Sequence, residues 1–362
     1  MKIMLVLGTR PEIIKLSIII ELLKKEGFNY FLVHTNQHYS KEMSKIFFRG
    51  LKIKLPDYKL SVNKKSEIKQ ISKIIINLES IIIKEKPTHL IVQGDTNSAL
   101  AGAIAGYKMK LKVCHIEAGL RSHDLEMPEE VNRILIDHLS DYLFVPTSVS
   151  KDNLLQEGIN RNRIFLVGNT IVDVLNKNMK LSAKSRFLER FKLKKKEYLL
   201  LTIHRQSNVD NKSRISNIIL GLKELSEYLK MPIIWPIHPR ARKRILSFKI
   251  NLPININPIE PLNFFDFLSA EKNSKLVLTD SGGVQEECCI LKVPCITLRD
   301  NTERPETIVC RSNILAGTNP NKIFNITKEM MGHKNNWNNP FGDGKSSQRI
   351  ISILKLLNNL NS

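Results

Sequence analysis

Three carboxylates in this 362-residue chain stand where apolar segments end or begin. Asp95 follows "THLIVQG", Glu117 follows "LKVCHI", and Glu129 opens "PEEVNRILIDH". A carboxylate in such a place is often only a helix cap or a favourable charge at a helix start. Carboxylates that converge on one site instead serve as general acids and bases. Asp95 and Glu117 are our first candidates for that chemistry because both end central strands, and Glu129 is the third.

The segment "LTDSGGVQEE" runs an apolar strand into Ser281, Gly282 and Gly283. The nucleophile elbow of serine hydrolases, G-x-S-x-G, has a glycine two residues before the serine, whereas Thr279 stands there in this chain. Two glycines at a helix start let backbone N–H groups approach a phosphate, which the helix N-terminus also favours. A plain strand-to-helix turn is the alternative interpretation.

Two cations in "GTRPEIIK" are left over after local structure is accounted for. Thr9 and Glu12 have the spacing of a capping box, and Pro11 is tolerated in the first turn of a helix. Arg10 and Lys15 have no such role. Because helical side chains lean toward the N-terminus, both can reach an anion near the helix start. Solvated surface charges are the alternative.

Two further cationic side chains are candidates. His204 closes the apolar run "YLLLTI" and is placed to give a hydrogen bond or a proton to a phosphate oxygen. A satisfied polar group at a strand end is the alternative. Arg133 lies four residues after Glu129, so the two are expected to pair along one helix face unless Arg133 binds the substrate.

Short apolar runs alternate with helical segments along the chain. The runs are "KIMLVLG", "YFLVHT", "THLIVQGD", "LKVCHIEA", "DYLFVPT", "RIFLVGN", then "YLLLTIH", "PIIWPIH", "KLVLTDS" and "PCITLRD". Near-continuous apolar strands indicate parallel sheets covered on both faces. The pattern pauses at about 170–197 and then restarts, which predicts an α/β protein with two doubly wound domains facing a cleft. Ligands of such sheets bind beyond the carboxyl ends of the strands.

Composition sets broad limits. Hydrophobic residues make up 42% and charged residues 25% of the chain, as in ordinary globular proteins. The net charge of +21 keeps a nucleic-acid-binding protein as one hypothesis, but the lysines are scattered and no nucleic-acid motif accompanies them. No signal segment or membrane span is expected. The five cysteines are odd in number and lack C-x-x-C spacing. We therefore expect buried free thiols, as in a protein of the reducing cytoplasm, and no zinc site.

The motifs taken together resemble the non-hydrolysing UDP-N-acetylglucosamine 2-epimerases. They are "GTRPEIIK", "QGDTNSALAGA", "HIEAGLRS", "MPEEVNR", "TIHR", "LTDSGGVQEE", "RDNTERPE" and "NPFGDGKSSQRI", and the resemblance runs from residue 3 to about 352. It implies a GT-B-like fold with two Rossmann-like domains, 1–170 and 171–345, and a C-terminal helix, 346–362, that returns to the first domain. It also implies reversible conversion of UDP-GlcNAc to UDP-ManNAc in a homodimer, without nicotinamide or metal.

The resemblance assigns roles by motif. Arg10 and Lys15 would hold the diphosphate from the first domain, with Arg133 also at the substrate. The second domain would bind the nucleotide through His204, Ser281, Gly282, Gly283, Phe267 against the uracil, Glu287 at the ribose and Arg304 as the last part of the anion clamp. Ser281 is then part of a phosphate cradle and not a nucleophile.

Some positions depart from the family pattern. In "TNQHYSKEMSKIFF", Gln37 fits the activation site of bacterial members, but Ser40 stands where a second glutamine is usual. Parts of the chain also look like the branch acting on diacetamido-glucuronate nucleotides, although that branch usually lacks an arginine at position 304. A 2-epimerase of that related nucleotide sugar is the main alternative, followed by a hydrolysing epimerase and a GT-B glycosyltransferase.

The chemistry itself favours an elimination. The hydrogen on carbon 2 is not acidic, and "GTRPEIIK" is not the G-x-G-x-x-G fingerprint of a nicotinamide-binding turn. Loss of UDP would give 2-acetamidoglucal, and protonation from the other face with return of UDP would complete the inversion. Two faces require two separately placed acid/base groups.

Overall fold

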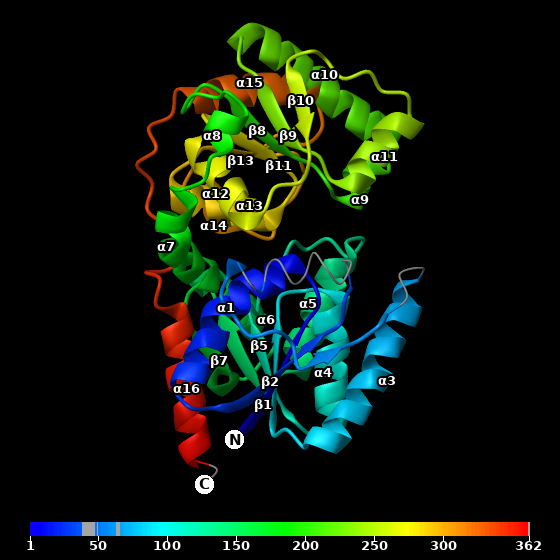
Figure 1. Cartoon of the computed structure of the whole chain (residues 1–362), viewed down its shortest axis with the longest axis vertical. Helices are drawn as coiled ribbons and strands as arrows, with labels where there is room; N and C mark the ends of the chain where they lie inside the picture. Colours follow the sequence, from blue (N-terminus) through cyan, green and yellow to red (C-terminus); the bar gives the residue numbers. More distant parts are fainter. Residues whose placement is uncertain (38–47, 49, 63–65, 361–362) are drawn as a thin grey trace. The chain divides into compact units, whose positions relative to one another are not determined.

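The computed structural model describes residues 1–37, 48, 50–62 and 66–360, and the chain divides into two compact units. Unit 1 comprises Met1–Asn176 and Phe341–Ser362, and unit 2 comprises Lys177–Pro340. Figure 1 shows each unit as a sheet flanked by helices. The division falls within helix α7 (Thr170–Ser182).

Unit 1 is built on a seven-stranded sheet of order β3-β2-β1-β4-β5-β6-β7. Its strands are β1 (Lys2–Leu7), β2 (Asn29–His34), β3 (Tyr58–Lys59), β4 (His89–Gln93), β5 (Lys112–Ile116), β6 (Tyr142–Val145) and β7 (Ile164–Leu166). The helices described in this unit are α1 (Arg10–Lys25), α3 (Glu67–Glu85), α4 (Asn97–Lys108), α5 (Pro128–Leu139), α6 (Ser148–Gln156), the 3-10 helix η1 (Arg161–Arg163), the start of α7, and α16 (Ser346–Leu360).

Unit 2 is built on a six-stranded sheet of order β10-β9-β8-β11-β12-β13. Its strands are β8 (Leu199–Thr202), β9 (Ile233–Pro236), β10 (Ile256–Ile259), β11 (Leu276–Thr279), β12 (Cys295–Thr297) and β13 (Asn313–Leu315). Its helices are α8 (Phe187–Arg190), α9 (Gln206–Val209), α10 (Lys212–Leu229), α11 (Pro239–Ser247), α12 (Phe264–Asn273), α13 (Gly282–Leu291), α14 (Pro305–Val309) and α15 (Pro320–Met331).

Every strand pair described in the two sheets is parallel, as the apolar runs predict. The central strands are buried along almost their whole length, since helices cover both faces. The strand order reverses once in each sheet. In unit 1 the reversal lies between the neighbours β1 and β4, and in unit 2 between β8 and β11. Ligands of doubly wound sheets bind at these points.

The last helix belongs to unit 1, as expected. Helix α16 lies along α1 (Figure 1), and Lys355 pairs with Glu26 at 2.5 Å. The backbone N–H groups of Ser346 and Ser347 donate to the carboxylate of Asp173, at 3.2 and 2.8 Å. These bonds satisfy two of the backbone N–H groups that have no acceptor within the helix at its start.

Two features differ from the sequence expectations. The pause at 170–197 contains helix α7 and the short helix α8. Strands β3, β10 and β13 were not expected, because they are short and stand away from the sheet centres. Strand β10 also contains Asn257 and Pro258, which disfavour a strand except near an edge.

Candidate active site

The turn after β1 is organised by Glu12. Its carboxylate accepts the backbone N–H groups of Gly8 and Thr9, at 3.0 and 2.7 Å, and the hydroxyl of Thr96, at 2.9 Å. Burial raises the pKa of Glu12 to about 7, although these hydrogen bonds act in the opposite direction. The capping-box interpretation is confirmed. Arg10 is the first residue of α1 and is half-buried, so it lies at the strand reversal of unit 1.

Lys15 and Glu117 form a buried ion pair at the end of β5. Lys15 Nζ lies 2.5 Å from Glu117 Oε2, and Gln93 Nε2 donates to the same oxygen at 2.7 Å. Lys15 is therefore not a solvated surface charge. Glu117 has φ of +70°, which is uncommon for a residue other than glycine and costs about 1–3 kcal/mol. The turn after β5 holds this carboxylate in a fixed place without a helix behind it.

Asp95 follows β4, the strand next to β5, but it does not cap the following helix. The N-cap of α4 is Thr96, whose side chain accepts the N–H of Ala99. The carboxylate of Asp95 accepts from Arg133 Nε at 3.0 Å, and Asn132 donates to its backbone oxygen at 2.9 Å. The side chain of Asp95 is 28% exposed, whereas that of Arg133 is almost completely buried. Asp95 is thus a fixed carboxylate that solvent can reach.

Arg133 binds two carboxylates within unit 1. Besides Asp95 it pairs with Glu130, three residues earlier on α5, and Glu130 is buried. The expectation from sequence was a pair with Glu129, which is the second residue of α5 and half-buried. Glu130 can pair with Arg133 because residues i and i+3 also share a helix face. Arg133 therefore anchors α5 to the end of β4.

Asp280 organises the end of β8 in unit 2. This buried carboxylate accepts the backbone N–H groups of His204, at 3.1 Å, and Arg205, at 3.0 Å. His204 Nδ1 lies 3.2 Å from it. Burial alone would raise the pKa of Asp280, but the His204 charge and these hydrogen bonds hold it below its usual value. The His204 side chain is 44% exposed, and with Nδ1 on Asp280 its Nε2 is the nitrogen left for a ligand.

Ser281 is the N-cap of α13, and the glycines form its first turn. Ser281 has the ordinary extended conformation (φ −93°, ψ 126°), and its side chain makes no capping hydrogen bond. It therefore lacks the strained turn of a nucleophile elbow. A Cβ on Gly282 would lie 2.3 Å from Glu303 Oε1, so packing requires this glycine. A Cβ on Gly283 would meet only Ser281 Oγ, at 4.0 Å, so packing does not require the second one.

Three arginines surround the carboxylates beside Gly282. Glu303 lies 2.8 Å from Arg299, 3.4 Å from Arg205 and 3.6 Å from Arg304, and Arg304 also pairs with Glu286. Glu303 and Arg304 are both buried. Sequence reasoning identified Arg304 but missed the other four residues. The motifs "TIHR", "LTDSGGVQEE" and "RDNTERPE" contain them, yet only the fold brings them together.

The remaining predicted residues have structural settings of their own. Phe267, on α12, packs against the core that includes β8 and α13. Glu287 lies one turn after Gly283 on the same face of α13 and is half-buried. Gln37 is buried and accepts the backbone N–H of Ser98 at 3.0 Å, which attaches it to the start of α4. Ser40 lies outside the described residues.

Residues 20–355 match the family of UDP-N-acetylglucosamine 2-epimerases. The chain belongs to this family. A UDP-N-acetylglucosamine 2-epimerase from Methanocaldococcus jannaschii is 51% identical over 98% of this chain and 99% of its own length. A UDP-2,3-diacetamido-2,3-dideoxy-D-glucuronate 2-epimerase from Pseudomonas aeruginosa is 36% identical over 99% of this chain and 100% of its own length.

The fold agrees with this assignment. A crystal structure of the M. jannaschii UDP-GlcNAc 2-epimerase, in complex with UDP-GlcNAc and UDP, has a TM-score of 0.94. It is 51% identical and the match covers 98% of this chain and 100% of that one. The expected GT-B-like α/β fold of this epimerase family member is therefore confirmed.

Neither a metal site nor a membrane span is found in the part of the chain that the structure describes. Across residues 1–37, 48, 50–62 and 66–360, no three His, Cys, Asp or Glu side chains are grouped to hold a metal ion. The helices in this part of the chain include none long and apolar enough to span a bilayer. What the described residues do offer is a pair of fixed carboxylates in unit 1 and a helix N-terminus with basic side chains in unit 2.

Proposed function

We propose that this chain interconverts UDP-GlcNAc and UDP-ManNAc by inverting carbon 2 through elimination and re-addition of UDP. One observation carries the mechanism: Asp95 and Glu117 end adjacent parallel strands, and a buried cation holds each carboxylate. Without Lys15 the buried carboxylate of Glu117 would be neutral or strongly disfavoured, whereas Asp95 is partly exposed and Arg133 fixes its position. The pairing with Arg133 and Lys15 supports two carboxylates that are available, in fixed positions, for proton transfer.

The reaction follows from the weak acidity of the hydrogen on carbon 2. Departure of UDP breaks the bond from carbon 1 to oxygen and leaves positive charge on the sugar. A carboxylate takes the hydrogen of carbon 2 as a proton, and its bonding electrons form the double bond of 2-acetamidoglucal. Protonation of the opposite face and attack of UDP on carbon 1 give the epimer. We assign the two proton transfers to Asp95 and Glu117, with Glu129 as the third candidate.

Unit 2 is suited to the nucleotide. The first N–H groups of α13 have no partner within the helix, and the Ser281 side chain does not cap them. Gly283 is needed by neither packing nor a positive φ, so close approach of a diphosphate is the reason we propose for it. His204 Nε2 and Arg304 would stabilise the departing charge, together with Arg10 and Lys15 of unit 1. Phe267 would lie against the uracil, and Glu287 would bind the ribose.

The test is a proton spectrum of the pure protein incubated in heavy water with UDP-GlcNAc alone. We expect UDP-ManNAc to appear without any acceptor, with deuterium at carbon 2 of the product. Product that keeps the substrate hydrogen at carbon 2 would refute the elimination. Free UDP and ManNAc would indicate a hydrolysing epimerase, and turnover only with an added acceptor would indicate a glycosyltransferase.

The related nucleotide sugar is the second candidate, because the Pseudomonas relative is 36% identical over nearly the whole chain. UDP-2,3-diacetamido-glucuronate carries a carboxylate that UDP-GlcNAc lacks. Parallel assays with the two nucleotides decide between them. We expect faster conversion of UDP-GlcNAc, and conversion of the glucuronate nucleotide alone would replace our assignment.

We also propose that the enzyme is a cytoplasmic homodimer. Ile68, Ile76 and Ile83 are 78%, 63% and 60% exposed, and their spacing places them on one side of α3. Such a row of large apolar side chains favours burial against a second copy. The free thiols suit a reducing compartment. Light scattering after size exclusion should give a dimer for the native chain and a monomer for Ile76→Glu. A native monomer at micromolar concentration would refute the dimer.

A further inference from the structure

Two cysteines of unit 2 lie in contact outside the residues discussed above. Cys289 is on α13, and Cys310 is the C-cap of α14. Their sulfur atoms are 3.7 Å apart. A disulfide requires about 2.05 Å, so a small local shift would join them. Cys289 is buried, whereas Cys310 is only half-buried, which corrects the expectation that all five thiols are buried.

The two thiols differ in chemical character. The hydrogen bonds that Cys310 shares with Cys289 and, secondarily, with Ser312 lower the pKa of Cys310 to about 6, although burial acts against this. The same contact and burial raise the pKa of Cys289. Burial also raises the pKa of Cys114 and of Cys288. The thiolate is the nucleophile in thiol chemistry, so Cys310 is the more reactive member of the pair.

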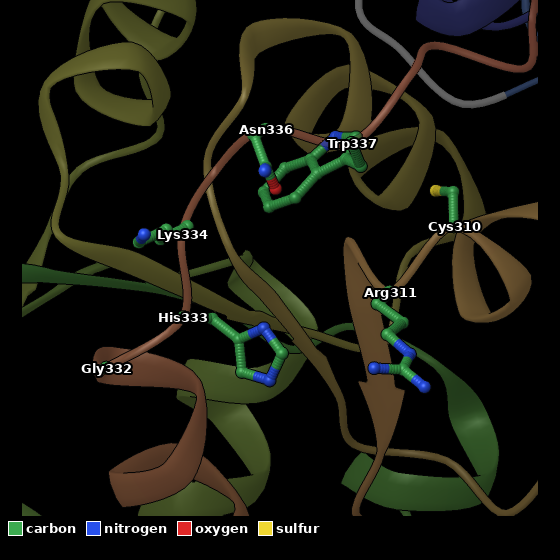
Figure 2. Close-up of a pocket in the computed structure, with 7 residues that line it drawn as sticks. All are labelled: Cys310, Arg311, Gly332, His333, Lys334, Asn336 and Trp337. Carbon is green, nitrogen blue, oxygen red and sulfur yellow. The ribbon is translucent and has the colours of Figure 1, made fainter.

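Cys310 opens into a cavity of about 430 Å³ whose lining is basic. Figure 2 shows Cys310 and Arg311 on one side and the segment from Gly332 to Trp337 on the other. Arg311, His333 and Lys334 contribute nitrogen-bearing side chains, and among the described residues that line the cavity none is acidic. The Trp337 indole N–H donates to the backbone oxygen of Cys289 at 2.9 Å. The cavity wall is thus attached to the second cysteine.

We propose that Cys310 and Cys289 form a thiol–disulfide exchange site for a small anionic disulfide bound in this basic cavity. The Cys310 thiolate attacks one sulfur of the disulfide, and the other sulfur leaves as a thiolate that takes up a proton. Cys289 then loses its proton to solvent and attacks the Cys310 sulfur, which releases the second small thiol. In sum, two protein thiols are oxidised to one disulfide and one small disulfide is reduced to two thiols.

The first test uses 5,5′-dithiobis(2-nitrobenzoate), an anionic disulfide, with the full chain. We expect each protein chain to release two coloured thiolates in the fast phase. Mass spectrometry should then give an intact mass lower by two hydrogens and, after digestion, a peptide pair joined by a Cys289–Cys310 disulfide. Cys289→Ser should release one thiolate and keep a mixed disulfide at Cys310, and Cys310→Ser should lose the fast phase. A fast adduct on Cys114, Cys288 or Cys295 of the native chain, or a stable adduct on Cys310, would overturn the proposal.

The second test addresses the charge of the cavity. In Arg311→Gln/Lys334→Gln the anionic probe should react about tenfold more slowly, whereas neutral 4,4′-dithiodipyridine should react at the native rate. The matched control is Lys194→Gln/Lys230→Gln, which removes the same charge from a different cavity of unit 2. Equal slowing of both probes, or equal slowing in the control variant, would show that this cavity does not select anions.

Discussion

The strand reversals of the two units share a topology but differ in how they use charge. In unit 1 the two candidate catalytic carboxylates follow the adjacent strands β4 and β5, and each has a cation of its own, Lys15 for Glu117 and Arg133 for Asp95. In unit 2, at β8 and β11, a helix N-terminus and the exposed ring of His204 lie near three arginines that share the buried carboxylates of Glu303 and Glu286. Under the function that we propose, the same fold element would carry proton transfer in unit 1 and most of the nucleotide binding in unit 2.

The largest expected effect is on turnover and comes from unit 1. Glu117→Gln or Asp95→Asn removes a proton acceptor, so kcat should fall by about a hundredfold or more. The Kd for UDP, measured by calorimetry, should stay within about twofold because neither carboxylate is assigned to the nucleotide. Release of 2-acetamidoglucal by either variant would be direct support. If either variant lost affinity for UDP but kept the native kcat, the assignment of that carboxylate to proton transfer would be wrong.

A second effect concerns the stability of unit 1. The folded pKa of Glu12 is about 7 against an ordinary value of 4.5, so its contribution is present below pH 4.5 and is lost as pH rises through 7. Glu12→Gln keeps the neutral shape. Its stability relative to the native chain should therefore rise by on the order of 2–3 kcal/mol between pH 4.5 and 8.

Urea unfolding of both chains at several pH values measures this difference. Glu26→Gln is the control, because Glu26 is an exposed carboxylate at the other end of α1 whose pKa is lowered by Lys355. Its trend should have the opposite sign, since the stabilisation by Glu26 is lost as pH falls. A Glu12→Gln difference that does not change with pH would contradict the burial argument.

Arginine variants test the proposed contacts with the diphosphate, which include Arg304 of unit 2 and Arg10 of unit 1. Arg304→Ala or Arg10→Ala should weaken UDP binding by about ten- to a hundredfold, since each removes a charge-assisted hydrogen bond worth roughly 1.5–3 kcal/mol. Arg304→Ala also leaves the buried Glu286 without this cation, so its melting temperature must be compared with that of the native chain. If a folded Arg304→Ala protein bound UDP with the native affinity, Arg304 would not be one of the residues that bind the diphosphate.

The smallest effects are expected at the first turn of α13. Gly283→Ala places a methyl group in open space beside Ser281 Oγ, so the fold should be unchanged while UDP affinity falls about tenfold. Gly282→Ala is the contrast, because its methyl group meets Glu303 and should destabilise unit 2 itself. Ser281→Ala should be mild because the backbone still donates. Lost turnover with native UDP affinity in Ser281→Ala would return the serine to consideration as a nucleophile.

The sequence predicted the central strands and many of the residues that follow them. Apolar runs marked β4 and β5, and the capping spacing marked Glu12, because these signals are local. The pairing of Lys15 with Glu117 joins positions far apart in the chain, and the contact of Gly282 with Glu303 depends on how α13 meets the next loop. Neither leaves a local signal. The short strands β3 and β13 were missed because pairing, not composition, defines them.

The path of the chain has a consequence for the order in which the protein folds during its synthesis. Unit 2 is one continuous stretch inserted into unit 1. All of it leaves the ribosome before Phe341, so it can fold while unit 1 still lacks α16. Until α16 is synthesised, the face of α1 that it covers is exposed to solvent, and the Asp173 carboxylate lacks the hydrogen bonds from Ser346 and Ser347. Unit 1 is therefore begun first and completed last. A chain that ends after Pro340 contains all of unit 2 but a unit 1 that lacks α16.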